Sequence, residues 1–312
     1  MLPGIANGQF MSLPDAGADL ATVRVHPLVV LLPEEDPKVL RQLADKPTEL
    51  AQYKAYLVQY SAQAHELAPK LWKLSPTVEF RSESDFKALR SSKEQAVVLH
   101  YTERRMNEVG YNTAADFMGS YKARQMECEL VGGRGGHSLW RGATPVDGAT
   151  YASDLATTLR GLQTDLARAA TQTGLHMRQS MASEMLHQMQ LTELLRTKTL
   201  LLSEADLRDQ LTPAGVRALY PQAVQVVPLA TIEAAVLSGD ARYTYVRHLA
   251  SPVGGTGPNV IDMATGEIVA ARRSEKEAGI TKQYLQSLAS LAASYEQDAP
   301  RRAKLQQMLS SK

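Results

Sequence analysis

The order of strand and helix patterns constrains the fold most, because one order occurs twice along the chain. The strand patterns of the first half are residues 23–32, 77–80 and 96–101. Those of the second half are residues 198–202, 223–227 and 243–248. In each half, helical patterns separate the strands, and a glycine-rich turn and a further strand follow. Such alternation is typical of parallel sheets, and we therefore predict an α/β protein with two βαβ-type lobes.

The glycine-rich turns of the two halves also resemble each other. Val131–Leu139 can be laid on Val253–Ile261 without a gap, with four identities, three of which are glycine. This resemblance favours an internal duplication, in which a ligand would lie in a cleft between the lobes. Chance explains it equally well, because glycine-rich hairpin turns are common.

Two long helical patterns occur, one within the first half and one between the two halves. Residues 50–71 and 155–169 carry apolar side chains at alternating spacings of three and four, which predicts heptad-patterned helices. The second pattern resumes after Gly174, so it indicates either one helix of 45 residues or two helices. The predicted organisation is a flexible arm (1–20), a first α/β lobe (21–147) with a long helix (46–74), a helical segment (148–197), and a second α/β lobe with a C-terminal helix (198–312).

Charge and cysteine content exclude several classes of protein. The 312 residues include 34 Lys and Arg and 33 Asp and Glu, whereas a dedicated nucleic-acid-binding protein usually has a clear basic excess. Cys128 is the only cysteine, so an intramolecular disulfide and a cysteine-based zinc cluster are excluded. No apolar run is long enough for a transmembrane helix. We expect a soluble protein, either cytoplasmic or exported with its signal peptide removed.

Five residues suggest an anion-binding surface. Arg104 and Arg105 follow the strand pattern 96–101, and the carboxyl ends of parallel strands are where ligands bind in open α/β sheets. Arg134, His137 and Arg141 lie in or next to the first glycine-rich turn, where backbone N–H groups can also contact an anion. A solvated charge run and an ordinary hairpin turn are the competing interpretations, and the composition favours them.

The histidines and methionines give no strong metal motif. His100 and His248 lie in the corresponding third strands of the two lobes and are candidate ligand contacts. Glu184 and His187 form one Glu-x-x-His pair, which we interpret as a solvated helix face because no second pair accompanies it. The methionine stripe 177, 181, 185 and 189 favours helix packing over binding of a soft metal. We expect no cofactor and no metal.

These observations favour a non-enzymatic, two-lobed α/β protein that binds a small molecule or a protein. An interaction or assembly protein that acts through its long helices, including a homo-oligomer, is the first alternative. An enzyme whose residues are dispersed beyond recognition is the second, although no catalytic motif such as G-x-S-x-G is present. We expect no nucleic-acid partner.

Overall fold

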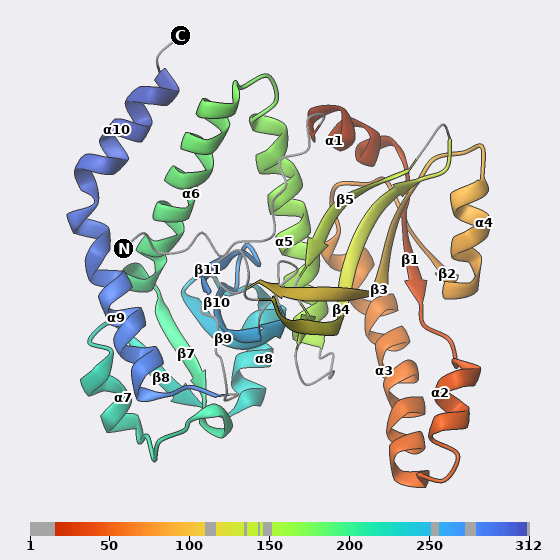
Figure 1. Ribbon diagram of the computed structural model, residues 1–312, viewed down its shortest axis with the longest axis horizontal. Coiled ribbons are helices and arrows are strands. Elements are labelled where there is room, and N and C mark those ends of the chain that lie inside the picture. Colours follow the sequence, from red (N-terminus) through yellow and green to blue (C-terminus); the bar gives the residue numbers. More distant parts are fainter. Residues whose placement is uncertain are drawn as a thin grey trace.

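Two β-sheets with the same strand order form the frame of the protein in the computed structural model (Figure 1). The first sheet has the order β2-β1-β3-β4-β5, and the second has the order β8-β7-β9-β10-β11, with β6 paired to β9. The structure describes residues 16–109, 117–133, 136–142, 144–145, 152–250, 256–271 and 279–310. The prediction of a mixed α/β protein with two sheets is confirmed.

The strands of the first sheet are β1 (Leu28–Leu32), β2 (Val78–Ser82), β3 (Ala96–Val109), β4 (Phe117–Val131) and β5 (His137–Gly142). The strands of the second sheet are β6 (Thr144–Pro145), β7 (Thr199–Ser203), β8 (Val224–Val227), β9 (Tyr243–Ala250), β10 (Thr256–Asp262) and β11 (Ile268–Ala271).

Strand directions also agree between the two sheets. β1 is parallel to both β2 and β3, and β7 is parallel to both β8 and β9. The remaining pairs, β3–β4–β5 and β9–β10–β11, are antiparallel. The predicted parallel relation of β2 and β3 is therefore correct, but β1 lies between them.

The first lobe is the first sheet with helices α1 (Ala16–Val25), α2 (Pro37–Gln42), α3 (Pro47–Leu71), α4 (Phe86–Ser91) and α5 (Ala152–Thr171). The second lobe is the second sheet with helices α6 (Met177–Thr197), α7 (Pro213–Leu219), α8 (Leu229–Ser238), α9 (Lys282–Gln297) and α10 (Ala299–Ser310).

Each sheet has helices on both faces. In the first lobe, α1, α3 and α5 share a core with one face, while α4 covers the other. In the second lobe, α6, α7 and α9 share a core with one face, and α8 covers the other. The order of the helices along the chain is thus matched as well as that of the strands.

The two heptad-patterned stretches contribute to the same core. Tyr60 and Ala64 of α3 and Leu159 and Leu162 of α5 are almost completely buried in the first lobe. Apolar side chains at spacings of three and four give a helix one apolar face. Both of these faces are therefore used inside the lobe.

The helical segment after residue 148 consists of two helices. The chain turns between α5 and α6 near Gly174, which has a φ of +82°. Glycine tolerates this left-handed conformation because it has no Cβ atom. The two-helix alternative is therefore correct.

Several predicted boundaries are wrong. Residues 23–25 end α1, and β1 begins only at Leu28. Much of the segment 103–120, interpreted as irregular, is strand, since β3 continues to Val109 and β4 begins at Phe117. The single C-terminal helix expected of the second lobe is in fact two helices, because α10 follows α9 after Gln297. The predicted flexible arm lies mostly outside the described residues, but α1 begins within it at Ala16.

The gap-free superposition of the glycine-rich turns is also wrong. Gly132 and Gly133 lie between β4 and β5, whereas residues 254 and 255 lie between β9 and β10. The matching strand order makes β4–β5 equivalent to β10–β11, so the two turns occupy different places in their lobes. Part of each turn, residues 134–135 and 251–255, lies outside the described residues.

Candidate functional site at the junction of the lobes

Helix α5 contacts both lobes. Its apolar face is buried in the first lobe, while polar side chains on its other side contact the second. The Asp154 carboxylate accepts two hydrogen bonds from the Arg247 guanidinium of β9, at 3.0 and 3.1 Å. The hydroxyls of Thr157 and Tyr245 lie 2.8 Å apart. A paired, bidentate contact of this kind fixes direction as well as distance.

Farther along α5, Arg160 donates hydrogen bonds to the last carbonyl oxygens of a helix in the second lobe. Its Nη1 and Nη2 donate to the carbonyl oxygens of Val236 and Leu237, at 2.5 and 3.0 Å. These carbonyls end α8, and helix ends leave such groups without intrahelical donors. Burial lowers the pKa of the Arg160 guanidinium despite the opposing effect of Tyr245.

The backbones of the two lobes come very close beside Arg160, on the same part of α5. A Cβ atom on Gly266, in the β10–β11 turn, would lie 2.3 Å from the Thr157 carbonyl oxygen and 2.5 Å from the Gly161 nitrogen. Gly266 is therefore required by space, and it also has a φ of +73°. A Cβ atom on Gly161 would lie 3.0 Å from the Gly266 oxygen, which is a tight contact.

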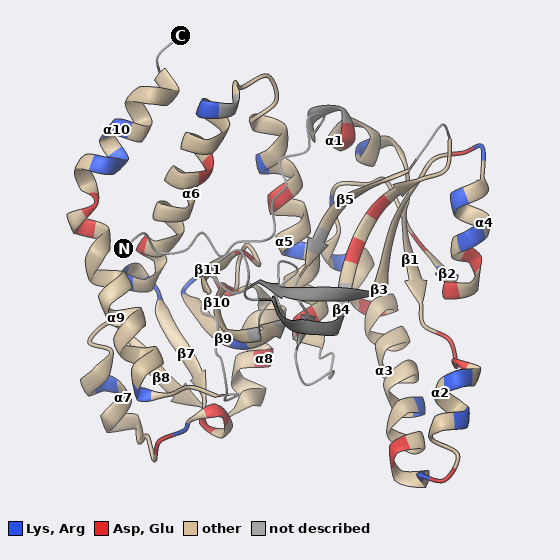
Figure 2. Ribbon diagram, in the orientation of Figure 1, with Lys and Arg blue, Asp and Glu red and all other residues tan. Residues whose placement is uncertain are grey.

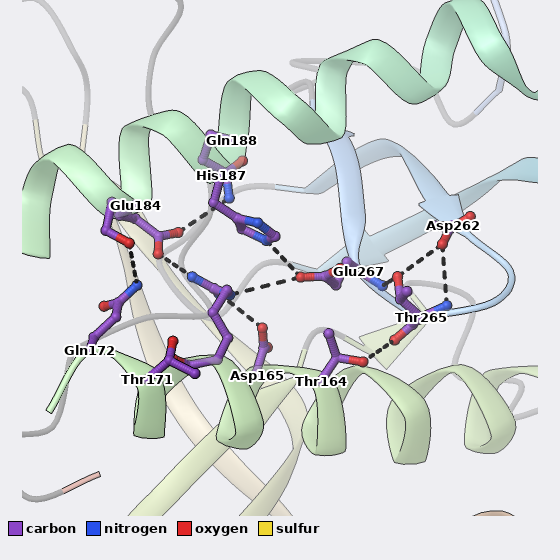
Figure 3. Close-up of polar contacts among 12 residues, drawn as sticks. Thr164, Asp165, Thr171, Gln172, Glu184, His187, Gln188, Asp262, Thr265 and Glu267 are labelled. Atoms are coloured by element: carbon purple, nitrogen blue, oxygen red, sulfur yellow. Dashed lines mark hydrogen bonds and ion pairs between the residues drawn. The ribbon is translucent and has the colours of Figure 1, made fainter. Parts of the chain in front are cut away.

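Arg168 is the centre of a charged cluster at the end of this contact, and Figure 3 labels its partners Asp165, Glu184 and Glu267. Its guanidinium pairs with Asp165 of α5 at 3.0 Å and with Glu184 of α6, and its Nε lies 3.9 Å from Glu267 in the β10–β11 turn. Glu267 is also 2.7 Å from the Nε2 of His187, which projects from α6 toward it. The cluster therefore joins α5, α6 and the second sheet.

Burial separates the carboxylates of this cluster. It raises the pKa of Asp165 to about 6, although the charge of Arg168 and the hydrogen bond from Trp140 act in the opposite direction. Burial would also raise the pKa of Glu267, but the hydrogen bond and charge of His187, with the charge of Arg168, leave it lowered. Glu267 therefore ionises more readily than Asp165 does.

Sequence reasoning missed this cluster. Glu184 and His187 were interpreted as a solvated helix face, but their side chains are only 24% and 22% exposed, and both bind charged partners. Asp262 and Glu267, at the β10–β11 turn, are also buried. The signal was the Glu-x-x-His pair itself, whose partners lie far away in the sequence.

A second polar cluster lies in the first sheet, under α4. His100 of β3 and Glu127 and Glu129 of β4 are 6%, 1% and 7% exposed, respectively. One potential ligand atom from each lies within 4.8 Å of the other two. Figure 2 shows acidic positions, in red, within the first sheet. Burial, with the charges of Glu129 and Glu127, raises the pKa of the Cys128 thiol far above its usual range, so this thiol is unreactive.

Arg104 and Arg105 do not lie at the end of a strand. They lie within β3, where Arg104 is opposite Ala123 and Arg105 is opposite Lys122. The side chains of both arginines, and that of Arg141 in β5, lie outside the described residues, as does Arg134 altogether. Their role in anion binding stays a prediction.

The three histidines of the predicted site are not brought together. His137 pairs with Asp19 of α1 at 2.9 Å, and its side chain is 45% exposed. The Nε2 of His248 accepts a hydrogen bond from the Gly279 nitrogen at 3.0 Å. His100 and His248 do lie in corresponding strands, β3 and β9. When Leu28 of β1 is matched to Leu200 of β7, however, the residue equivalent to His100 is Arg247, not His248. The two histidines therefore face opposite sides of their sheets.

Part of the methionine stripe packs as predicted. Met185 and Met189 contact a small core of Ala182, Leu186 and Leu305 between α6 and α10. Met181 is 59% exposed. The side chain of Met177 lies outside the described residues.

Comparison with known proteins gives no family for this chain, because no family model, curated protein or solved structure matches it. Among the described helices, none combines the length and the apolar character needed to cross a membrane. The interpretation of the site therefore depends on its own geometry.

Proposed function

We propose that this chain is a non-enzymatic binding protein in which two α/β lobes, derived from one duplicated unit, act as a single rigid body. The observation that carries the proposal is the use of α5, which is part of the first lobe's core and binds the second lobe through its polar side. A ligand or partner that touches both lobes would then meet a preorganised surface, which lowers the entropic cost of binding.

The common architecture supports the duplication. In each lobe, a helix precedes the first strand, two helical connections follow, and three strands lead to a helix that packs back on the core. The strand order and all strand directions match. Independent origin would have to reproduce each of these choices separately.

The pairing of charged groups supports binding rather than catalysis. Arg168 and Arg247 are bound to carboxylates of the opposite lobe, and His187 is bound to Glu267 of its own lobe. Groups held in such pairs stabilise an orientation, whereas a catalytic group must reach a substrate.

A thermal-shift screen of small molecules and peptides tests the proposal. We expect some compounds to stabilise the wild-type protein, because a ligand that binds only the folded state raises the melting temperature. Ligands that bridge the lobes should lose affinity in Asp154→Asn, which weakens the junction. The matched control is Asp240→Asn, whose partner Arg242 lies in the same lobe and is 76% exposed. No stabilising compound, or a compound that the protein converts chemically, would contradict the proposal.

Assembly through helices is the second candidate, and one observation favours it. Met181 of α6 and Met308 of α10 are 59% and 37% exposed, and these helices pack on each other at one end of the second lobe (Figure 1). Methionine is common on adaptable binding surfaces.

Light scattering over a range of concentrations tests this candidate. Self-association should be present in the wild type and lost in the double variant Met181→Asp and Met308→Asp. Val58→Asp is the control, because Val58 is 72% exposed but lies on α3 of the other lobe. A wild-type protein that stays monomeric at high concentration would exclude self-assembly.

A further inference from the structure

The buried polar cluster of the first sheet has an arrangement that its surroundings do not require. His100 of β3 lies directly opposite Glu127 of β4, and Glu129 follows two residues later on the same face. The neighbours on that face are apolar and include Val29, Leu31 and Val98. Three titratable side chains therefore gather within an otherwise apolar layer.

Two carboxylates in such a layer need nearby positive charge. Moving an ionised carboxylate out of water is costly unless it is paired and hydrogen-bonded. Arg90 of α4 lies 3.7 Å from one oxygen of Glu129, but its side chain is 58% exposed. In the ladder, Glu127 is also opposite Arg141 of β5. Of the two carboxylate oxygens of Glu129, Oε2 lies near Arg90 and Oε1 faces His100.

The hydrogen bonds of the His100 ring decide which kind of atom Oε1 of Glu129 contacts. The ring Nδ1 lies 3.1 Å from the Tyr101 carbonyl oxygen. A carbonyl can only accept, so Nδ1 carries the proton of this bond. In neutral imidazole, Nε2 is then a lone pair, and it lies 3.2 Å from Oε1 of Glu129. Two lone pairs at this distance repel each other unless a proton or a metal cation lies between them.

We propose that this species is a divalent transition-metal ion, Zn²⁺ or Mn²⁺, bound by Nε2 of His100 and by carboxylate oxygens of Glu127 and Glu129. Imidazole nitrogen suits zinc, and carboxylate oxygen suits manganese, so the mixed set fits both ions. Ligand atoms at roughly 2.1 Å from a tetrahedral zinc are about 3.4 Å apart, close to the separation of Nε2 and Oε1. Water would complete the coordination.

The surroundings of His100 match those of a metal ligand. Histidine ligands commonly donate their second ring N–H to a backbone carbonyl or carboxylate, which fixes the tautomer. The bond to Tyr101 has that form. Phe86 of α4 packs on the other side, with its ring centroid 4.3 Å from that of His100. The competing account is an ion pair between a doubly protonated His100 and Glu129, without a metal.

Isothermal titration of protein stripped with EDTA and purified without a histidine tag separates the two accounts. Titration with ZnCl₂ or MnCl₂ should show one bound ion per chain, and CaCl₂ should not compete. Glu127→Gln and Glu129→Gln keep the shape of the side chains and should each weaken binding by more than about 100-fold, the upper range for outer-shell changes. His65→Gln and Glu79→Gln, at exposed or half-exposed sites of the same lobe, should bind as the wild type does.

A surface variant keeps the test independent of folding of the core variants. Arg90→Gln removes a cation beside Glu129 and should tighten binding, because the metal no longer meets its repulsion. Paramagnetic Mn²⁺ should also broaden the NMR signals of the His100 ring before those of His65. No bound ion in the titration, or binding that survives both Glu→Gln changes, would overturn the proposal in favour of the ion pair.

Discussion

The two lobes place a polar side chain, buried in the first lobe and half-buried in the second, at the same position of the same strand, but they satisfy it differently. With Leu28 of β1 matched to Leu200 of β7, His100 of β3 corresponds to Arg247 of β9. His100 lies opposite Glu127, whereas Arg247 lies opposite Asn259 and binds Asp154 of α5. The first lobe thus satisfies the position from its own sheet, and the second from a helix of the other lobe.

This difference shows how a repeated unit can become one rigid body. Only one of the two lobes needs to receive a helix from its neighbour for their orientation to be fixed. In the other lobe, the equivalent position is released from that task and can hold a charged cluster. The predictions below test whether α5 has this role and whether the lobes respond unequally to its loss.

The largest effect is expected where the lobes touch through backbone alone. Gly266→Val should destabilise the protein by about 4 kcal/mol or more, the range of severe core changes, because its Cβ atom would lie 2.3 Å from the Thr157 oxygen. Chemical denaturation measures this loss. Gly174→Ala is the control, since Gly174 also has a positive φ, of +82°, but nothing lies within 4 Å. It should cost only about 1–2 kcal/mol, and equal losses would contradict the packing argument.

Removing the partner of the buried arginine should have the next largest effect. Asp154→Ala leaves Arg247, 15% exposed, without its bidentate carboxylate. We expect a loss of about 3 kcal/mol, since breaking a buried pair strands a charge. Asp240→Ala, which breaks an exposed pair, should cost less than about 1 kcal/mol. Hydrogen exchange should show faster exchange in the second sheet than in the first, and a uniform increase would contradict the unequal roles of the lobes.

The last effect, no larger than that of Asp154→Ala, concerns pH. Burial raises the pKa of Asp165 to about 6, whereas it is near 4 in an unfolded chain. Between these values the folded state binds more protons, so this residue's contribution to stability falls as pH rises from about 4 to 6. The total is up to about 3 kcal/mol, for two pKa units at about 1.4 kcal/mol each.

Asp165→Asn replaces the titrating carboxyl group with an amide, so a comparison with the wild type isolates the effect of this titration on stability. Unfolding free energies of the two proteins should be compared from pH 4 to pH 7, because other groups titrate in the same range. The stability of the wild type relative to the variant should decline across this range. A constant or rising difference would show that Asp165 is ionised throughout.

The parts of the fold that depend on local pattern were predictable. Leu28–Leu32 and the start of β3 are apolar and rich in valine, and the apolar positions of α3 include its buried Leu57, Tyr60, Ala64 and Leu67. Residues 23–25 were mistaken for strand because Val23 and Val25 favour that state locally. Packing overrides this preference, since Val23 is completely buried beside α5 as part of α1.

The junction could not be predicted, for a different reason. Asp154 and Arg247 are 93 residues apart, and His187 and Glu267 are 80 residues apart. No spacing rule connects residues at such separations, and each looks like an ordinary polar residue in its own helix or strand. The cluster of His100, Glu127 and Glu129 left a fainter signal, because these residues interrupt the apolar stretches Ala96–Leu99 and Cys128–Val131 or lie next to them.

The distance between the lobes in solution tests the central claim most directly. Spin labels on Lys87→Cys in α4 and Arg217→Cys in α7 occupy exposed positions of the two lobes, while Cys128 is buried. Double electron–electron resonance spectroscopy should give one narrow distribution of distances between the two labels, and Asp154→Ala should broaden this distribution. A broad or two-peaked distribution in the otherwise unchanged protein would show that α5 does not hold the lobes as one body.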